Sequence, residues 1–130
     1  DCSLELLQEA VRRVPEIEWI HEDMRGLNLE RSFDGLIAWN SFFHLSHDDQ
    51  REMFPVFSAH AVKGAALMFT SGTDHGEAIG EFQGEPLYHA SLAEAEYREL
   101  LSENGFEVLQ HVKEDPHCNH QTIWLARCIR

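Results

Sequence analysis

The stretch that decides the fold runs from Ser32 to Ser46 and reads S-F-D-G-L-I-A-W-N-S-F-F-H-L-S. Its first half, Phe33 to Trp39, is a short apolar run opened by an Asp-Gly pair, which is typical of a strand buried on both faces. The run ends abruptly at Asn40. Ligands of open α/β sheets bind in the crevice beyond the carboxyl ends of strands, so the residues after this run are the first candidates for a site. The alternative is that the aromatic residues pack beneath the helix that follows.

Length and charge restrict the class of protein. The chain has 130 residues, 43% of them hydrophobic, which suits one compact domain with a core. Ten basic and 23 acidic residues give a net charge of −13, which disfavours nucleic-acid and membrane-surface partners. No apolar run reaches the roughly 20 residues that a membrane-spanning helix needs, and no signal-peptide pattern is present. Three cysteines without C-x-x-C spacing (Cys2, Cys118 and Cys128) favour reduced thiols and a cytoplasmic protein.

The residues before the central run predict a helix and a strand. Apolar residues at helical spacing predict a helix from Leu4 to Val14, capped by Ser3 and ended by Pro15. The β-branched and aromatic segment Ile17–Ile20 predicts a strand that ends in a polar cluster.

The residues after the central run predict a second helix and a second buried strand. Ser46 opens a sequence that resembles a capping box, and the helix is expected to end at Lys63-Gly64. Pro55 lies inside this helix, where we expect a kink or a split. The apolar run Ala65–Thr70 predicts a strand covered on both faces.

The C-terminal third predicts a helix and two antiparallel strands. A capping box at Ser91 predicts a helix that ends near Asn104. Alternating residues at 106–112 and 121–128 predict the two strands. The whole order predicts a single α/β domain over residues 1–130, a three-layer sandwich whose mostly parallel sheet has helices on both faces and an antiparallel C-terminal hairpin.

Residues 71–90 interleave glycines with acidic residues and match no P-loop pattern. They predict either a flexible loop or irregular hairpin, or a functional lid over a site. His75, Tyr88 and His89 bracket this segment and are the candidate substrate contacts.

The closing pattern of a strand, a helix ending in Gly-Phe and two antiparallel strands resembles the end of a class I S-adenosylmethionine-dependent methyltransferase. Three other stretches are similar to the same family: D-C-S-L-E-L-L-Q-E-A from Asp1, H-E-D-M-R from His21, and F-D-G-L-I-A-W-N-S-F-F-H-L from Phe33. The resemblance implies a Rossmann-like fold, S-adenosylmethionine as cofactor and a small molecule as methyl acceptor.

The resemblance also implies roles for individual residues. Asp1 would accept hydrogen bonds from both ribose hydroxyls, Asp23 would bind the adenine amine, and Met24 would touch the adenine ring. The residues beside the methionine half of the cofactor would be Trp39, Asn40 and Ser41. His44 would point toward the substrate and is the candidate general base.

One departure from the family is large. The family's first strand and its G-x-G-x-G loop have no counterpart here, so we expect an N-terminally truncated form of the fold. In the family this strand lies mid-sheet, next to the strand that Phe33–Trp39 resembles. Its absence would leave an unpaired edge, which must be covered by Ile17–Ile20, by a partner chain or by the missing segment. We therefore expect a homo-oligomer formed through this edge, or a rearranged sheet.

Two other functions stay open on the sequence. A methyltransferase-like module without catalysis would keep the packing and associate through the exposed edge. A zinc site could use His117, Cys118 and His120, although no distant ligand is evident and no metal ligand is assigned.

Overall fold

A four-stranded sheet forms the centre of the molecule. The structure is a computed structural model that describes all 130 residues. The strands are β1 (Phe33–Ala38), β2 (Ala61–Ser71), β5 (Phe106–Asp115) and β6 (Gln121–Cys128), in the order β1-β2-β6-β5. Only β1 and β2 are parallel, and the other two pairs are antiparallel. The sheet is therefore mixed rather than mostly parallel, although the antiparallel C-terminal hairpin forms as predicted.

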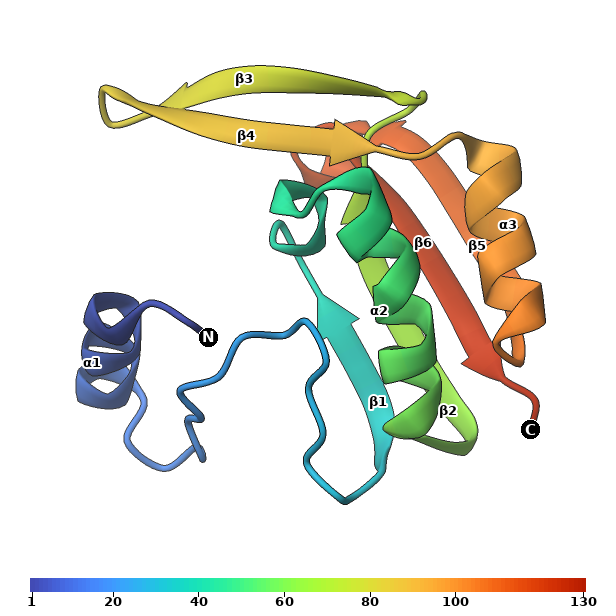
Figure 1. The fold of residues 1–130 in the computed structure, drawn as a ribbon, viewed down its shortest axis with the longest axis horizontal. Helices are drawn as coiled ribbons and strands as arrows, with labels where there is room; N and C mark the ends of the chain where they lie inside the picture. Colours follow the sequence, from blue (N-terminus) through green and yellow to red (C-terminus); the bar gives the residue numbers. More distant parts are fainter.

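Two helices cover one face of this sheet. They are α2 (His47–Ala59) and α3 (Glu94–Glu103), which lie in front of the strands in Figure 1. Fifteen buried residues form the core between them and the sheet, and its largest fully buried members are Phe42, Phe54, Phe69, Tyr97 and Trp124. Helix α1 (Leu4–Arg13) lies apart, beyond the outer edge of β1 (Figure 1). The predicted helices on both faces are thus present on one face only.

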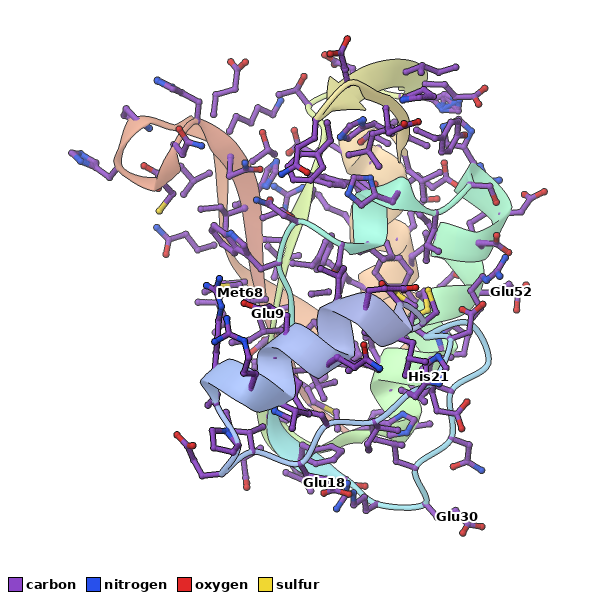
Figure 2. The ribbon with its side chains drawn as sticks, turned by 90° about the vertical axis from the view of Figure 1, so that its left-hand side faces the viewer. Glu9, Glu18, His21, Glu30, Glu52 and Met68 are labelled. Atoms are coloured by element: carbon purple, nitrogen blue, oxygen red, sulfur yellow. The ribbon has the colours of Figure 1, made fainter.

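The second face of the sheet is largely uncovered. Ile37 is 75% exposed, so β1 is not buried on both faces as predicted. Ile37 pairs with Met68 of β2, which pairs with Leu125 of β6, so these side chains form an apolar row across the sheet. Figure 2 shows Met68 on the opposite side of the ribbon from Glu52 of α2. Ala66 of β2 is exposed on this face as well, which corrects the prediction for the second strand.

The predicted strand at Ile17–Ile20 does not form. These residues have no strand conformation. The amino group of Asp1 donates to the Ile20 carbonyl (2.9 Å), and the Glu22 N–H donates to the Asp1 carbonyl (3.0 Å). A strand needs a neighbour along its whole length, and none is present here. The outer edge of β1 therefore stays unpaired.

The N-terminal caps follow the sequence closely. Ser3 accepts a hydrogen bond from the Leu6 N–H, and Ser46 accepts one from the Asp49 N–H. Helix α1 buries only Leu7. Helix α2 continues through Pro55 and is not split, although the proline cannot donate the i→i−4 hydrogen bond to the Arg51 carbonyl.

Two predicted helix boundaries are wrong. Helix α2 ends at Ala59 rather than at Lys63-Gly64, because β2 already begins at Ala61 and pairs with β1 at Phe33. The capping box at Ser91 is absent, since Ala93 is the N-cap of α3 and makes no side-chain bond. Ser91 instead belongs to a strand, and its hydroxyl donates to the Leu92 carbonyl.

Residues 76–91 form a regular hairpin rather than a flexible loop. Strands β3 (Gly76–Phe82) and β4 (Glu85–Ser91) pair through seven residues each and make a second, two-stranded sheet. The hairpin lies across the end of the main sheet toward which β1 points (Figure 1). The hairpin therefore lies beside the carboxyl end of β1, and its function as a lid stays a prediction.

Candidate functional site

The exit of β1 is shaped by a left-handed residue and a short helix. Asn40 has a φ of 48°, and its N–H donates to the Thr70 hydroxyl (2.8 Å) at the end of β2. The 3-10 helix η1 (Phe42–His44) follows at once. Phe42 is fully buried and its ring contacts Phe54, Phe57, Phe69 and Tyr97. The core therefore fixes the backbone that carries His44.

His44 joins the β1 exit to the hairpin. Its Nδ1 donates to the Tyr88 carbonyl (2.9 Å), because a carbonyl can only accept. In the neutral ring this leaves Nε2 unprotonated and able to accept a proton. The His44 ring also packs against Phe43 and His89, each with a centroid distance of 4.8 Å. The candidate base thus lies in a three-ring cluster under the hairpin.

A buried polar network attaches the hairpin to both helices. Gln50 of α2 is fully buried, and its amide donates to the carbonyls of Leu45 (3.0 Å) and Ala90 (2.9 Å). Its carbonyl accepts from the Tyr97 hydroxyl of α3 (2.6 Å). Burial raises the pKa of Tyr97, so this hydroxyl stays a donor. The Leu92 N–H donates to the Tyr97 hydroxyl oxygen (3.0 Å).

A second histidine holds the base of the hairpin. His47 Nε2 donates to the carbonyls of Gly76 and Ser91, both at 3.0 Å, and these two residues face each other in the β3–β4 ladder. The His47 ring stacks on His75, with centroids 4.4 Å apart. Arg51 donates to Glu96 (2.5 Å), which lowers the pKa of that carboxyl.

An apolar cavity opens at the unpaired edge of β1. Its volume is about 370 Å³, and ten of its 13 lining residues are hydrophobic. Met24 and Ser41 both line it, although they come from separate segments of the chain, before and after β1. Leu36 and Ala38 supply the strand wall, and Phe57 supplies the helix wall. The cavity therefore joins two of the predicted cofactor residues.

A polar pocket adjoins this cavity and contains Asp23. Its lining includes Glu22, Arg25 and Asn28, and it shares Leu27 and Leu29 with the apolar cavity. Hydrogen bonds from the side chain and backbone N–H of Arg25 lower the pKa of Asp23 to about 2. Asp23 is therefore ionised at neutral pH and can accept hydrogen bonds.

Among the comparisons with known proteins, only the comparison with solved structures found matches. No protein-family model matches the sequence, and no curated protein matches it at a significant level. The fold matches an S-adenosylmethionine-dependent methyltransferase from Clostridium acetobutylicum ATCC 824 with a TM-score of 0.80 and 14% identity, over 100% of this chain and 74% of the other. The chain has the class I methyltransferase fold.

Other solved methyltransferases share this fold with the chain. An amino pentose methyltransferase from Micromonospora echinaspora, solved with S-adenosylmethionine bound, matches with a TM-score of 0.77 and 15% identity over 98% of this chain and 71% of the other. A 1,6-didemethyltoxoflavin-N1-methyltransferase from Burkholderia thailandensis, solved with bound 1,6-didemethyltoxoflavin and S-adenosylhomocysteine, matches with a TM-score of 0.68 and 16% identity over 95% of this chain and 56% of the other. The predicted Rossmann-like methyltransferase fold is confirmed.

The methyltransferase fold gathers some of the predicted site residues and separates others. Met24 and Ser41 meet in the cavity, and His44 meets His89 in the ring cluster. The side chain of Asp1 accepts the Ser3 N–H (2.7 Å), and its backbone bonds place it beside residues 20–22. The remaining candidates have other surroundings: Trp39 is 40% exposed, Tyr88 donates to Glu77 (2.6 Å), and His75 stacks on His47.

The sequence did not reveal several residues that hold this methyltransferase fold together at the site. Gln50, Tyr97 and His47 connect the hairpin to α2 and α3, and no local pattern distinguishes them from ordinary helix residues.

The zinc hypothesis lacks a ligand set, because no group of three or more His, Cys, Asp or Glu side chains is placed to hold a metal ion. A bilayer-spanning segment would need a longer and more apolar helix than any that the structure contains.

Proposed function

We propose that this protein transfers a methyl group from S-adenosylmethionine to a small molecule. The observation that carries the proposal is the meeting of Met24 and Ser41 in one cavity beside the carboxyl end of β1. Ligands of open α/β sheets bind at this end of the strands. Asp23, ionised in the adjoining pocket, is the proposed partner of the adenine amine. Asp1 is the proposed ribose ligand, and Trp39 and Asn40 the remaining contacts to the methionine half.

His44 is the proposed general base. The cofactor supplies an electrophilic methyl group when bound, and the protein must orient the acceptor and remove its proton. The Tyr88 carbonyl holds Nδ1–H of His44, which favours the tautomer with a basic Nε2. Under this proposal the hairpin covers the acceptor, with His75, Tyr88 and His89 as its contacts.

The proposed acceptor is a neutral or cationic small molecule, with an amine favoured. The net charge of −13 repels anionic substrates. Amines also agree with the solved neighbours, which include an amino pentose methyltransferase and an N1-methyltransferase. Three free cysteines support the predicted cytoplasmic location.

Cofactor binding tests the proposal directly. Equilibrium dialysis with radiolabelled S-adenosylmethionine is expected to show saturable binding, and Asp23→Ala is expected to weaken it by about tenfold or more, because a charge-assisted hydrogen bond contributes about 1.5–3 kcal/mol. Glu99→Ala, a change of an exposed acid on α3, is the matched control and should leave the affinity unchanged. Absence of binding by the unaltered protein would overturn the proposal.

A second candidate function is a noncatalytic module that associates through β1. The unpaired outer edge of β1, the exposed Ile37 and the adjoining apolar cavity favour it. Association of two copies through this edge would satisfy backbone groups that now face water. This candidate predicts an oligomer that has no affinity for S-adenosylmethionine.

Light scattering combined with size-exclusion chromatography tests the second candidate. The protein is expected to elute as a dimer, and Ile37→Lys is expected to shift it to the monomer, because a charged lysine on an edge strand opposes pairing. Ile79→Lys is the matched control, since Ile79 is also 75% exposed but lies on β3. A monomeric unaltered protein, or equal effects of both variants, would contradict association through β1.

A further inference from the structure

Arg25 holds the carboxylate of Asp23 through two guanidinium nitrogens and its own backbone N–H. Nη2 donates to Oδ2 (2.6 Å), Nε lies 3.1 Å from each carboxylate oxygen, and the backbone N–H donates to Oδ1 (3.0 Å). A bidentate contact of this kind fixes geometry as well as charge, unlike most ion pairs at a protein surface. Asp23 is therefore held in one orientation, although 45% of its side chain is exposed.

The Asp23 carboxylate keeps room for one further donor. An ionised carboxylate has about four acceptor sites. Arg25 supplies three N–H groups, from Nε, Nη2 and the backbone. Because Asp23 is part of the lining of the polar pocket and is half-exposed, the remaining site is available to a ligand there. One N–H of an exocyclic amine matches this single site.

The third guanidinium nitrogen of Arg25 ties the same segment to α2. Nη1 donates to Asp49 Oδ2 (3.3 Å) in the first turn of the helix. At the other end of the helix, the Leu29 N–H donates to Nε2 of His60, the C-cap residue (3.0 Å). The segment 25–29 is thus attached to α2 at two points, and Arg25 extends this attachment to Asp23.

Met24 lies between the two residues of this ion pair and lines the apolar cavity. Its carbonyl accepts a hydrogen bond from the Leu27 N–H (3.2 Å), and Leu27 lines both the cavity and the polar pocket. The contacts of Arg25 therefore hold an apolar contact and a polar acceptor next to each other.

We propose that Arg25 is a positioning residue for the cofactor: it presents one acceptor site of Asp23 to the adenine amine while Met24 meets the adenine ring. This inference rests on the proposed function and deepens it, because it assigns the recognition of the base to an arginine that acts through Asp23. The same side-chain and backbone hydrogen bonds lower the pKa of Asp23 to about 2, so the acceptor stays ionised at neutral pH.

Two ligands that differ at one group test this role. Isothermal titration calorimetry would compare S-adenosylhomocysteine with S-inosylhomocysteine, in which a carbonyl oxygen replaces the amine. The unaltered protein is expected to prefer the adenosyl ligand by about tenfold, the effect of one charge-assisted hydrogen bond. Arg25→Gln is expected to weaken adenosyl binding about fivefold, the cost of ordering one side chain, and to leave inosyl binding unchanged. The preference then falls to about twofold.

Three further variants locate the effect. Arg31→Gln removes a comparably exposed arginine, which pairs with Glu18 (2.8 Å), and should change neither affinity. Arg25→Lys keeps the positive charge without the planar fork and should restore less than half of the lost preference. In an Asp23→Asn background, Arg25→Gln should have no further effect on the preference, because the two residues act as one unit.

The outcomes separate this inference from the proposed function. Failure of the unaltered protein to bind S-adenosylhomocysteine would overturn both. An unchanged preference in Arg25→Gln would show that the arginine at most maintains the segment around it, and full recovery in Arg25→Lys would show that charge alone suffices. Either of these two results would overturn the role of Arg25 and leave the proposed function standing.

Discussion

Replacing Gln50 by leucine is expected to lower the free energy of unfolding by about 3–5 kcal/mol. The two side chains have similar volumes, so the loss comes from polar groups rather than from a cavity. The carbonyls of Leu45 and Ala90 and the hydroxyl of Tyr97 would each lose their partner in the interior. An unsatisfied buried group costs about 1–3 kcal/mol. Urea denaturation followed by fluorescence of the tryptophans measures the change.

Two companion variants define what the Gln50 result means. Gln110→Leu changes the same residue type at an exposed position of β5 and should alter stability by no more than about 0.5 kcal/mol. Adding Tyr97→Phe to Gln50→Leu removes the orphaned hydroxyl, so the double variant should be less destabilised than the sum of the two single variants. Strict additivity would contradict the network.

Replacing Phe42 by alanine is expected to cost about 3–5 kcal/mol, the range for removing a fully buried phenylalanine. Its ring lies 5.3–6.2 Å, between centroids, from four other aromatic rings, and the cavity that remains cannot be filled by the surrounding rigid side chains. The same ring holds η1 in place, so the variant should also free His44 from the Tyr88 carbonyl. Urea denaturation measures the first effect, and the NMR signals of the His44 ring report the second.

The neighbouring residue provides the control for Phe42. Phe43 is only half-buried and packs against His44 and His89 rather than in the core. Phe43→Ala should therefore cost about 1 kcal/mol. If Phe42→Ala and Phe43→Ala lowered the free energy of unfolding equally, Phe42 would not be the residue that anchors the β1 exit in the core.

The parts of the fold that the sequence predicted have strong local signals. Ser3 and Ser46 precede acidic first turns, and each serine caps its helix as expected. The two C-terminal strands alternate apolar and polar residues, and they pair with each other. These features depend on a few neighbouring residues, so they can be recognised without knowing the rest of the molecule.

The parts that the sequence missed depend on distant residues. Ile17–Ile20 has the composition of a strand, yet composition cannot supply the neighbour that a strand requires. The contact between Gln50 and Tyr97 joins positions 47 residues apart, so no short pattern records it. For the site, the resemblance predicted Met24 and Ser41 as cofactor contacts, but only the folded chain shows that both line the same cavity.

The hairpin is fixed at one end only. Its anchors, at Gly76, Tyr88, Ala90 and Ser91, lie toward its base, whereas the turn at Gln83-Gly84 projects into solvent. Residues can therefore be inserted or deleted at this turn in matched pairs without disturbing the ladder or the core. Such changes in length would alter how far the hairpin extends beyond its anchored base while the rest of the framework stays the same.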